Sequence, residues 1–223
     1  MKPFSLLILA CILANTLFGQ RYVYDTAIVN NRVKFVIKTK DINADLALLL
    51  VYRNSKVILA DTLDNGGLMN IKLIDFNKDN SRDIMLTYIG NNLTYFLYLF
   101  DPVKNAFKKV EDFDKFPDAI QLKTNPKYYY SYHRAGCADF NWVSDLFTIE
   151  NFKAIHKGHI YGQGCDADIK EYPQQIEIFK ILNNNEMDTK RVAKLDYNKH
   201  IAVFGEKWDF IEAYWNKNYF KFK

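Results

Sequence analysis

Residues 141–162 read NWVSDLFTIE, then Asn151, then FKAIHKGHIYG. Apolar, aromatic and β-branched residues dominate both runs, which predicts two strands, Asn141–Glu150 and Phe152–Gly162. Asn151 between them is typical of a tight turn, so the two strands should fold back as an antiparallel hairpin. This segment therefore indicates a protein built on β-sheet.

Cys137 and Cys165 flank the hairpin. A turn centred on Asn151 places these two cysteines opposite one another, close enough for a disulfide. The alternatives are two buried free thiols or a metal pair. His156 and His159 are near in sequence, but three residues apart on a regular strand they should point to opposite faces, which gives a Cys/His zinc site no geometric support. We predict the disulfide.

The same pattern of short apolar runs separated by turn residues continues along the chain. The predicted strands are Val33–Lys38, Leu46–Tyr52, Lys56–Leu63, Met69–Ile74, Ile84–Ile89, Leu93–Phe100, Phe107–Val110, Tyr128–His133, Ile176–Leu182 and Arg191–Tyr197. No linker or repeat divides the chain. The expected fold is one all-β domain with antiparallel, propeller-like or sandwich-like sheets.

One amphipathic helix is predicted near the C-terminus, over Glu206–Asn216. It places Trp208, Ile211, Tyr214 and Trp215 at helical spacing, and this stripe should face the core. A shorter helix is expected near Pro117–Leu122.

The first residues have the layout of a secretory signal. Lys2 precedes an apolar run from Phe4 to Leu17, and small Gly19 is the expected last residue removed. We therefore expect a signal peptide over residues 1–19, a single β-rich domain over 20–223, and an exported, periplasmic or secreted protein. Cleavage before Cys11 as a lipoprotein and a retained anchor helix are the alternatives. No later segment is long and apolar enough to span a bilayer.

The composition excludes other classes. Of the 223 residues, 49% are hydrophobic, and 30 basic residues stand against 26 acidic ones. This hydrophobic content excludes intrinsic disorder. The lysines are interleaved with acids rather than clustered, which argues against a nucleic-acid partner.

Residues 75–83 carry the most specific chemistry in the sequence. Side-chain oxygens fall at alternate positions, on Asp75, Asn77 and Asp79, and then on Asp83, while the carbonyl of Ser81 adds a further oxygen. Calcium prefers such an oxygen shell, and a divalent cation would offset the repulsion among three carboxylates. The loop is not an EF-hand, because Leu86 stands at position 12 and strands flank it. Asn80 replaces the usual turn glycine and can enter the left-handed region. The alternative is a solvated, Asx-rich hairpin loop.

A strand, this Asp-x-Asn-x-Asp-x-x-x-Asp loop and a second strand resemble the calcium loop of FG-GAP/VCBS-type β-propeller proteins. The order also resembles small bacterial periplasmic proteins that carry a single such loop. The supporting segments are Ile89-Gly90-Asn91, Tyr95–Leu99, Phe100-Asp101-Pro102 and Ser131–Gly136, within roughly residues 64–162. Some members of that family are non-enzymatic immunity proteins that block lysozyme-type peptidoglycan hydrolases, and the resemblance implies such a role here.

A polar rim is expected beside the disulfide. Its members are His133, Arg134, Asp139, Asp166 and Asp168, with the last two across from Arg134–Gly136. Ser131 and His133 share an alternating face, but no nucleophile-elbow motif surrounds Ser131, so an Arg–Asp surface network is favoured over a hydrolase site.

The same segment suits a binding surface, because the disulfide fixes its base and limits the entropy lost on binding. We expect Ser131, Tyr132, His133 and Arg134 to contact the partner, a cell-wall hydrolase. The competing hypotheses are an envelope module that binds glycans through surface aromatics, or has a structural role, and an uncharacterised hydrolase.

Overall fold

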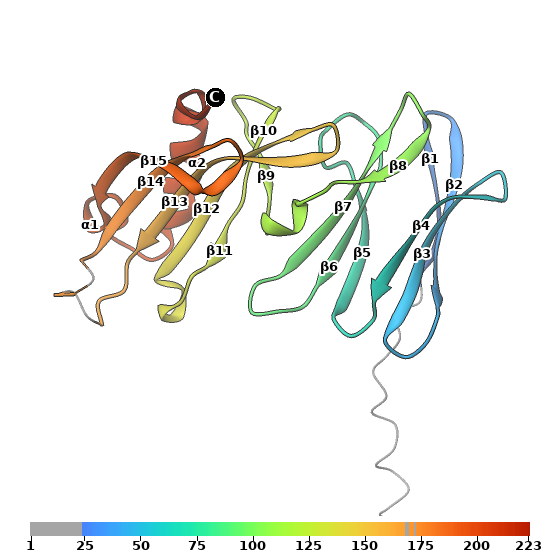
Figure 1. Ribbon diagram of the computed structural model, residues 1–223, viewed down its shortest axis with the longest axis horizontal. Coiled ribbons are helices and arrows are strands. Elements are labelled where there is room, and N and C mark those ends of the chain that lie inside the picture. Colours follow the sequence, from blue (N-terminus) through green and yellow to red (C-terminus); the bar gives the residue numbers. More distant parts are fainter. Residues whose placement is uncertain (1–23, 168–169, 172) are drawn as a thin grey trace, which may run out of the picture.

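Tight turns divide the chain into three consecutive antiparallel sheets, followed by a C-terminal helix. The computed structural model describes residues 24–167, 170–171 and 173–223. The expected signal peptide, Cys11 and Asp168 lie outside the described residues. The sheets succeed one another along the long axis of the molecule, with the helix beyond the third (Figure 1). The predicted class, antiparallel and sandwich-like β-sheet with a short C-terminal helix, is confirmed.

Sheet A and sheet B are four-stranded meanders in sequence order. Sheet A contains β1 (Asp25–Asn30), β2 (Val33–Asp41), β3 (Leu46–Arg53) and β4 (Lys56–Asp64). Sheet B contains β5 (Leu68–Ile74), β6 (Asp83–Tyr88), β7 (Thr94–Asp101) and β8 (Ala106–Lys109). Asn54 and Ser55 connect β3 to β4 with positive φ at both positions, the geometry that matches strand twist in a two-residue hairpin.

Sheet C has seven strands and carries the helical segments. Its strands are β9 (Ile120–Gln121), β10 (Tyr128–Tyr130), β11 (His133–Arg134), β12 (Asn141–Glu150), β13 (Lys153–Gln163), β14 (Gln175–Leu182) and β15 (Asn185–Asp196). The helical segments are η1 (Phe113–Lys115), η2 (Cys137–Asp139), α1 (Tyr197–His200), α2 (Glu206–Asn218) and η3 (Tyr219–Phe222).

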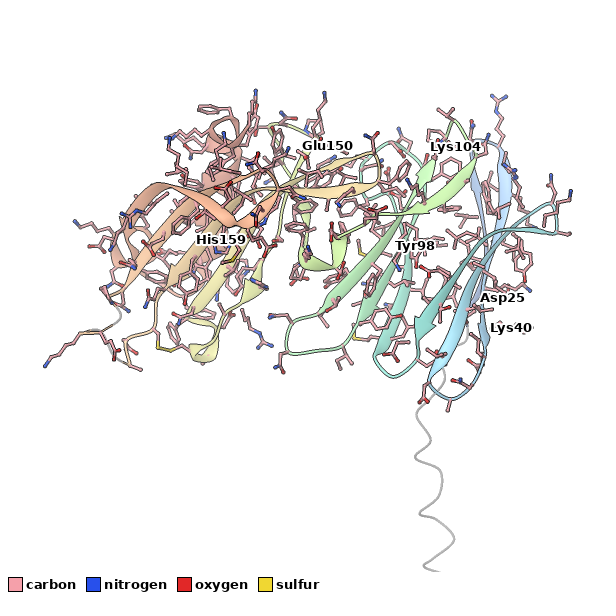
Figure 2. All side chains as sticks on the ribbon, in the orientation of Figure 1. Asp25, Lys40, Tyr98, Lys104, Glu150 and His159 are labelled. Atoms are coloured by element: carbon pink, nitrogen blue, oxygen red, sulfur yellow. A yellow bond between two sulfur atoms is a disulfide. The ribbon has the colours of Figure 1, made fainter. Side chains whose placement is uncertain are left out.

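Three hydrophobic layers hold the stack together. The layer between sheets A and B includes Phe35, Phe100 and Phe107, and the layer between sheets B and C includes Phe113 and Phe147. The third layer packs sheet C against α2 and η3. Polar bonds also cross between sheets. The hydroxyl of Tyr98 in β7, labelled in Figure 2, donates to Asp61 in β4 at 2.6 Å.

Two glycines of β13 allow aromatic rings to pack closely against sheet C. A Cβ added at Gly162 would lie 2.1 Å from the Trp142 ring, and one added at Gly158 would lie 2.5 Å from Phe222. Because real Cβ atoms do not approach so closely, these positions accept only glycine without rearrangement. The bare backbone of β13 therefore sets the distance at which the C-terminal aromatic residues pack.

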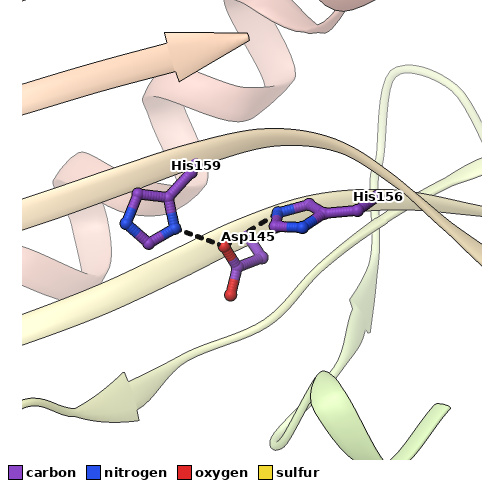
Figure 3. Close-up of side chains that lie close together, drawn as sticks. All are labelled: Asp145, His156 and His159. Carbon is purple, nitrogen blue, oxygen red and sulfur yellow. Dashed lines mark hydrogen bonds and ion pairs between the residues drawn. The ribbon is translucent and has the colours of Figure 1, made fainter. Parts of the chain in front are cut away.

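The β12–β13 hairpin departs from the predicted register. Asp145 pairs with His159, whereas Phe147 pairs with His156, so Lys157 is an extra residue in β13. Such a β-bulge reverses the alternation of side chains along the strand. The expectation that His156 and His159 point to opposite faces is therefore wrong. Both side chains lie beside Asp145 on the face toward sheet B (Figure 3).

Two further elements differ from the sequence predictions. No helix forms over Pro117–Leu122. Ile120 and Gln121 instead pair with Tyr130 and Tyr129 as an edge strand, because main-chain pairing with β10 prevails over local propensity. The first strand, β1, was not predicted. Among residues 24–167, 170–171 and 173–223, no helix has the length and apolar character needed to cross a membrane.

Candidate functional site

The loop between β5 and β6 holds itself together through its own side chains. The carboxylate of Asp75 accepts the amides of Asp79 and Asn80 at 3.0 and 3.1 Å. Asp79 accepts the Ser81 amide at 2.8 Å. Asn80 adopts φ of 67°, the left-handed conformation expected for the residue that replaces the turn glycine.

Asp83 closes the loop from inside the protein. Its side chain is fully buried and accepts the amides of Phe76 and Phe100, each at 2.9 Å. Burial raises the pKa of Asp83 to about 6, and the negative charges of Asp79 and Asp75 add to the rise. The hydrogen bonds from the two main-chain amides oppose it. A buried carboxylate repelled by two neighbours gains from a nearby cation.

The loop lies where the three sheets meet. Asn30 at the end of β1 bonds both the carbonyl and the amide of Arg82, each at 2.8 Å. Gln121 in β9 donates to the carbonyl of Asn77 at 3.0 Å. Phe76 stacks on Tyr129 of β10, with ring centroids 5.0 Å apart. The loop therefore joins sheets A and C through sheet B.

The donor atoms of the loop are of the kind that calcium, rather than a softer metal, prefers. Asp75, Asn77, Asp79, Ser81 and Asp83 offer only oxygen atoms, which is the preference of Ca²⁺. The three carboxylates do not all lie within 4.8 Å of one another. Each carboxylate oxygen that accepts an amide retains a second lone pair for an ion.

The predicted disulfide is confirmed. Cys137 and Cys165 are joined, with Cα atoms 5.8 Å apart. The hairpin register differs from the one used to predict it, because the pairing beyond the bulge is offset and Cys137 lies in the short helix η2. The bond ties the start of β12 to the segment that follows β13.

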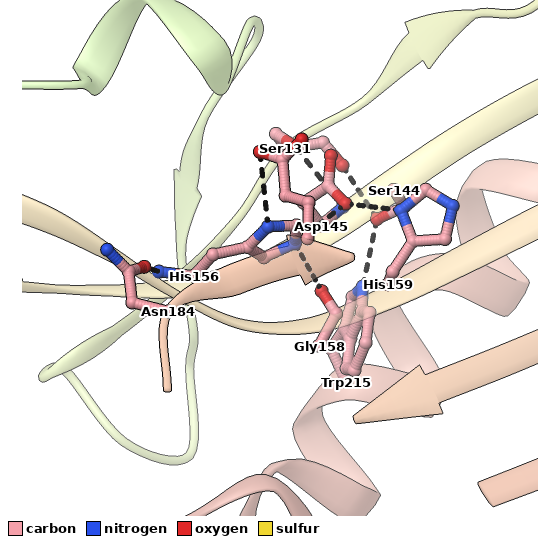
Figure 4. Close-up of polar contacts among 9 residues, drawn as sticks. Ser131, Ser144, Asp145, His156, Gly158, His159, Asn184 and Trp215 are labelled. Atoms are coloured by element: carbon pink, nitrogen blue, oxygen red, sulfur yellow. Dashed lines mark hydrogen bonds and ion pairs between the residues drawn. The ribbon is translucent and has the colours of Figure 1, made fainter. Parts of the chain in front are cut away.

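The expected partner contact at Ser131 is contradicted by its burial. Ser131 is only 1% exposed. Its carbonyl accepts the hydroxyl of Ser144 at 2.6 Å, and its own hydroxyl accepts the amide of Asp145 at 3.2 Å (Figure 4). Because β10 ends at Tyr130 and β11 begins at His133, Ser131 joins the two strand segments inside the sheet and has no face for a partner.

The remaining segment residues have different surroundings. Arg134 is exposed, and its guanidinium donates to the carbonyl of Asn91 in the β6–β7 turn. The Arg134 main chain exchanges two further bonds with Asn92, at 3.0 and 3.2 Å. His133 is half-buried, and burial lowers its pKa. The predicted Arg–Asp network is therefore replaced at Arg134 by a contact with sheet B, while Asp166 is exposed.

Tyr132 and Asp139 belong to a different cluster, centred on a buried lysine. Lys207 of α2 is 0% exposed, and its ammonium donates to the carbonyl of Asp139 at 2.8 Å and pairs with the Asp139 carboxylate at 3.0 Å. The ammonium also lies 3.7 Å from the Phe204 ring centroid and 4.4 Å from that of Trp208. Tyr132 donates its hydroxyl to Asp139 at 2.5 Å. These contacts fasten the disulfide segment to α2.

Around this lysine, four rings form a continuous surface that we name the aromatic rim: Tyr132, Phe140, Phe204 and Trp208. Ring centroids of neighbours lie 5.4–5.8 Å apart. Phe140 and Trp208 are each 44% exposed, and Phe204 is 39% exposed. Isolated exposed apolar residues are ordinary, whereas a contiguous group of them is a common feature of interaction sites.

Most of this rim was not predicted from the sequence. The stripe of Trp208, Ile211, Tyr214 and Trp215 was expected to face the core. Of these four residues Ile211 and Trp215 are buried, Tyr214 is partly buried and Trp208 is exposed. Phe204 and Lys207 were not singled out. Phe204 precedes the helix, which begins at Glu206, so helical spacing alone could not pair its ring with Trp208.

Comparisons with known proteins give limited information. No family model matches the chain, and no curated protein matches it. A solved structure of a Xanthomonas type IV secretion system related protein is similar with a TM-score of 0.47 and 15% identity, covering 76% of this chain and 93% of that one. A subtype N11 neuraminidase-like protein of A/flat-faced bat/Peru/033/2010 (H18N11) has a TM-score of 0.23 and 10% identity, covering 75% of this chain and 58% of that one. At these values neither structure identifies a function for this chain.

Proposed function

We propose that the chain is an exported, calcium-stabilised protein without catalytic activity of its own, and that it binds and inhibits a lysozyme-type peptidoglycan hydrolase. The observation that carries the proposal is the aromatic rim, exposed beside Arg134 and the disulfide. Aromatic residues and arginine are the side chains that most often dominate binding energy in protein interfaces. The resemblance of the 64–162 region to periplasmic immunity proteins supplies the class of partner.

The rim is prepared for binding because its supports are already in place. The disulfide, the Lys207–Asp139 pair and the bonds between Arg134 and the β6–β7 turn each restrain the segment that carries Tyr132. A restrained surface loses little conformational entropy when a partner covers it. A disulfide also suits an oxidising compartment outside the cytoplasm, which supports export.

The proposal is tested by the clearing of a peptidoglycan suspension. We expect the purified protein to slow clearing by a lysozyme-type hydrolase from the same envelope. Trp208→Ala should weaken inhibition roughly 10-fold or more, as expected for an interface anchor. Phe220→Ala provides the matched control, since this ring is 53% exposed in η3 and lies outside the rim. Thermal unfolding of both variants separates loss of contact from loss of fold.

Three outcomes would contradict the proposal. Clearing by the protein alone would make it a hydrolase. Co-sedimentation with peptidoglycan without inhibition would make it a glycan-binding module. Equal inhibition by the wild type, Trp208→Ala and Arg134→Ala would move the contact surface away from the rim.

A further inference from the structure

A second polar site lies on the opposite side of sheet C from α2 and is independent of the aromatic rim. The β12–β13 bulge brings Asp145, His156 and His159 together on the face toward sheet B (Figure 3). Their side chains come from two neighbouring strands rather than from a loop, so the fold itself fixes their positions. Asp145 and His156 are more than nine-tenths buried, and the His159 side chain is 30% exposed.

The donor atoms of the three side chains converge. Nε2 of His156 lies 3.0 Å from Oδ1 of Asp145, and Nδ1 of His159 lies 2.7 Å from the same oxygen. One ligand atom from each residue lies within 4.8 Å of the others, and no other such group of His, Cys, Asp or Glu occurs in the part of the chain that the structure describes. In a tetrahedral zinc site with bonds of about 2.0–2.2 Å, neighbouring ligand atoms are about 3.3 Å apart. Small movements would therefore admit an ion.

One ring nitrogen of His156, Nδ1, has no hydrogen-bond partner. Its Nε2 faces two acceptors, Oδ1 of Asp145 and the carbonyl of Gly158 at 3.1 Å, so hydrogen bonding requires the proton on Nε2. Nδ1 is then buried without a hydrogen-bond partner. An unsatisfied buried polar atom is costly and calls for an explanation.

We propose that Asp145, His156 and His159 bind a divalent transition-metal ion, with Zn²⁺ as the best match to two imidazoles and a carboxylate. With the ion on Nε2, His156 carries its proton on Nδ1. Nδ1 lies 3.8 Å from the Glu186 carboxylate, which can accept a hydrogen bond from it after a small shift. Pairing of a metal-bound histidine with an outer carboxylate is common in metal sites and orients the ring.

The surroundings supply an entry path and an open coordination position. A pocket of about 610 Å³ opens above the cluster, and Lys115, His133, Glu186 and Thr189 contribute to its wall. Three protein ligands leave a fourth position for water or a small anion from the pocket.

Titration of the purified protein with Zn²⁺ by calorimetry tests this proposal. Saturating Ca²⁺ is kept present so that the 75–83 loop does not compete. We expect one Zn²⁺ per chain. Affinity should fall at least 10-fold in His159→Gln and in Asp145→Asn, which each remove a ligand, and roughly 10-fold in Glu186→Gln, which removes the outer carboxylate.

The chain offers a matched control, because its fourth histidine, His200, lies in α1 beside Phe210 and away from the pocket. His200→Gln should bind Zn²⁺ like the wild type. His159→Gln is the main variant because His159 is the most exposed of the three ligands and its ring tolerates replacement best, and circular dichroism verifies its fold. Absence of Zn²⁺ binding, equal binding by wild type and His159→Gln, or loss only in Asp79→Ala would overturn the proposal. None of these results would affect inhibition through the aromatic rim.

Discussion

The buried carboxyl group of Asp83 both holds the 75–83 loop in shape and carries a raised pKa. It is fully buried, both carboxylate oxygens accept main-chain amides, and the chain crosses between β5 and β6 around it. The raised pKa is the consequence of placing this carboxyl away from water and near Asp75 and Asp79. The amide hydrogen bonds that hold the loop in shape favour the ionised carboxylate, whereas burial and the neighbouring charges oppose it.

The first prediction concerns pH. The pKa of Asp83 is about 6 when folded and close to the ordinary 3.8 when unfolded, so the folded state holds the proton longer. In chelator, the contribution of Asp83 to the free energy of unfolding is fully present below pH 4. It is lost as the pH rises to 6, at a cost of up to about 3 kcal/mol. Saturating Ca²⁺ should remove this loss.

Urea unfolding at each pH, with chelator and with Ca²⁺, measures the difference. The side-chain carboxyl carbon resonance of Asp83 should titrate near pH 6 in chelator. An Asp83 carboxyl that titrates near pH 4, or a Ca²⁺ effect that does not change between pH 4 and 6, would contradict the prediction.

Some features of individual residues could be predicted from the sequence, and others could not. It identified the Cys137–Cys165 bond and the left-handed Asn80, because both depend on local spacing and residue type. It missed the Asp145–His159 pair, since the predicted turn centred on Asn151 places Lys157 opposite Asp145. In the structure the turn contains both Asn151 and Phe152, and the bulge at Lys157 shifts the pairing by one residue more. One extra residue in β13 is not visible in apolar periodicity, because the residues around it alternate plausibly in either register.

At the scale of elements, backbone contacts decide more than propensity. The strands Asn141–Glu150 and the start of α2 at Glu206 agree with the sequence predictions, because their apolar patterns are long. β9 is only two residues long and exists through pairing with β10, so local propensity near Pro117 predicted a helix in its place. Short elements depend on partners that the sequence does not reveal.

The second prediction tests the close packing of β13. Gly162→Ala should lower the free energy of unfolding by about 1–3 kcal/mol, because the new methyl group collides with the buried Trp142 ring. Gly205→Ala is the matched control: nothing lies within 4 Å of its added Cβ, and its φ of −70° suits any residue. That variant should be neutral or stabilising by up to about 1 kcal/mol. Equal effects of the two changes in urea unfolding would disprove the packing argument.

At the scale of the molecule, the three sheets form a series in which sheet B connects the other two (Figure 1). The 75–83 loop contacts both neighbours, through Asn30 at the end of β1 and through Gln121 in β9. An ion that orders this loop should therefore stabilise the molecule as one unit rather than sheet B alone.

The third prediction follows from this placement. Calcium at about 100 times its Kd should raise the free energy of unfolding by about 2.7 kcal/mol. A single cooperative transition should be retained with the disulfide intact. Asp79→Ala should abolish the shift, whereas Asp114→Ala, which removes an acid of η1 outside the loop, should not. Thermal unfolding with Ca²⁺ and with chelator provides the measurement, and a transition indifferent to chelator would leave the loop as a polar turn.

The extra residue at Lys157 has a consequence for how this chain tolerates inherited change. Loss of that one codon in frame would leave His156 and His159 two residues apart on β13. Regular strand alternation would then keep both side chains on the face toward sheet B, and Ile160 would stay in the core that it shares with Trp142. The pairings of Phe147 with His156 and of Leu146 with Gly158 would also be unchanged. Related chains are therefore expected to tolerate loss of this residue more readily than loss of a residue from the regular part of the strand.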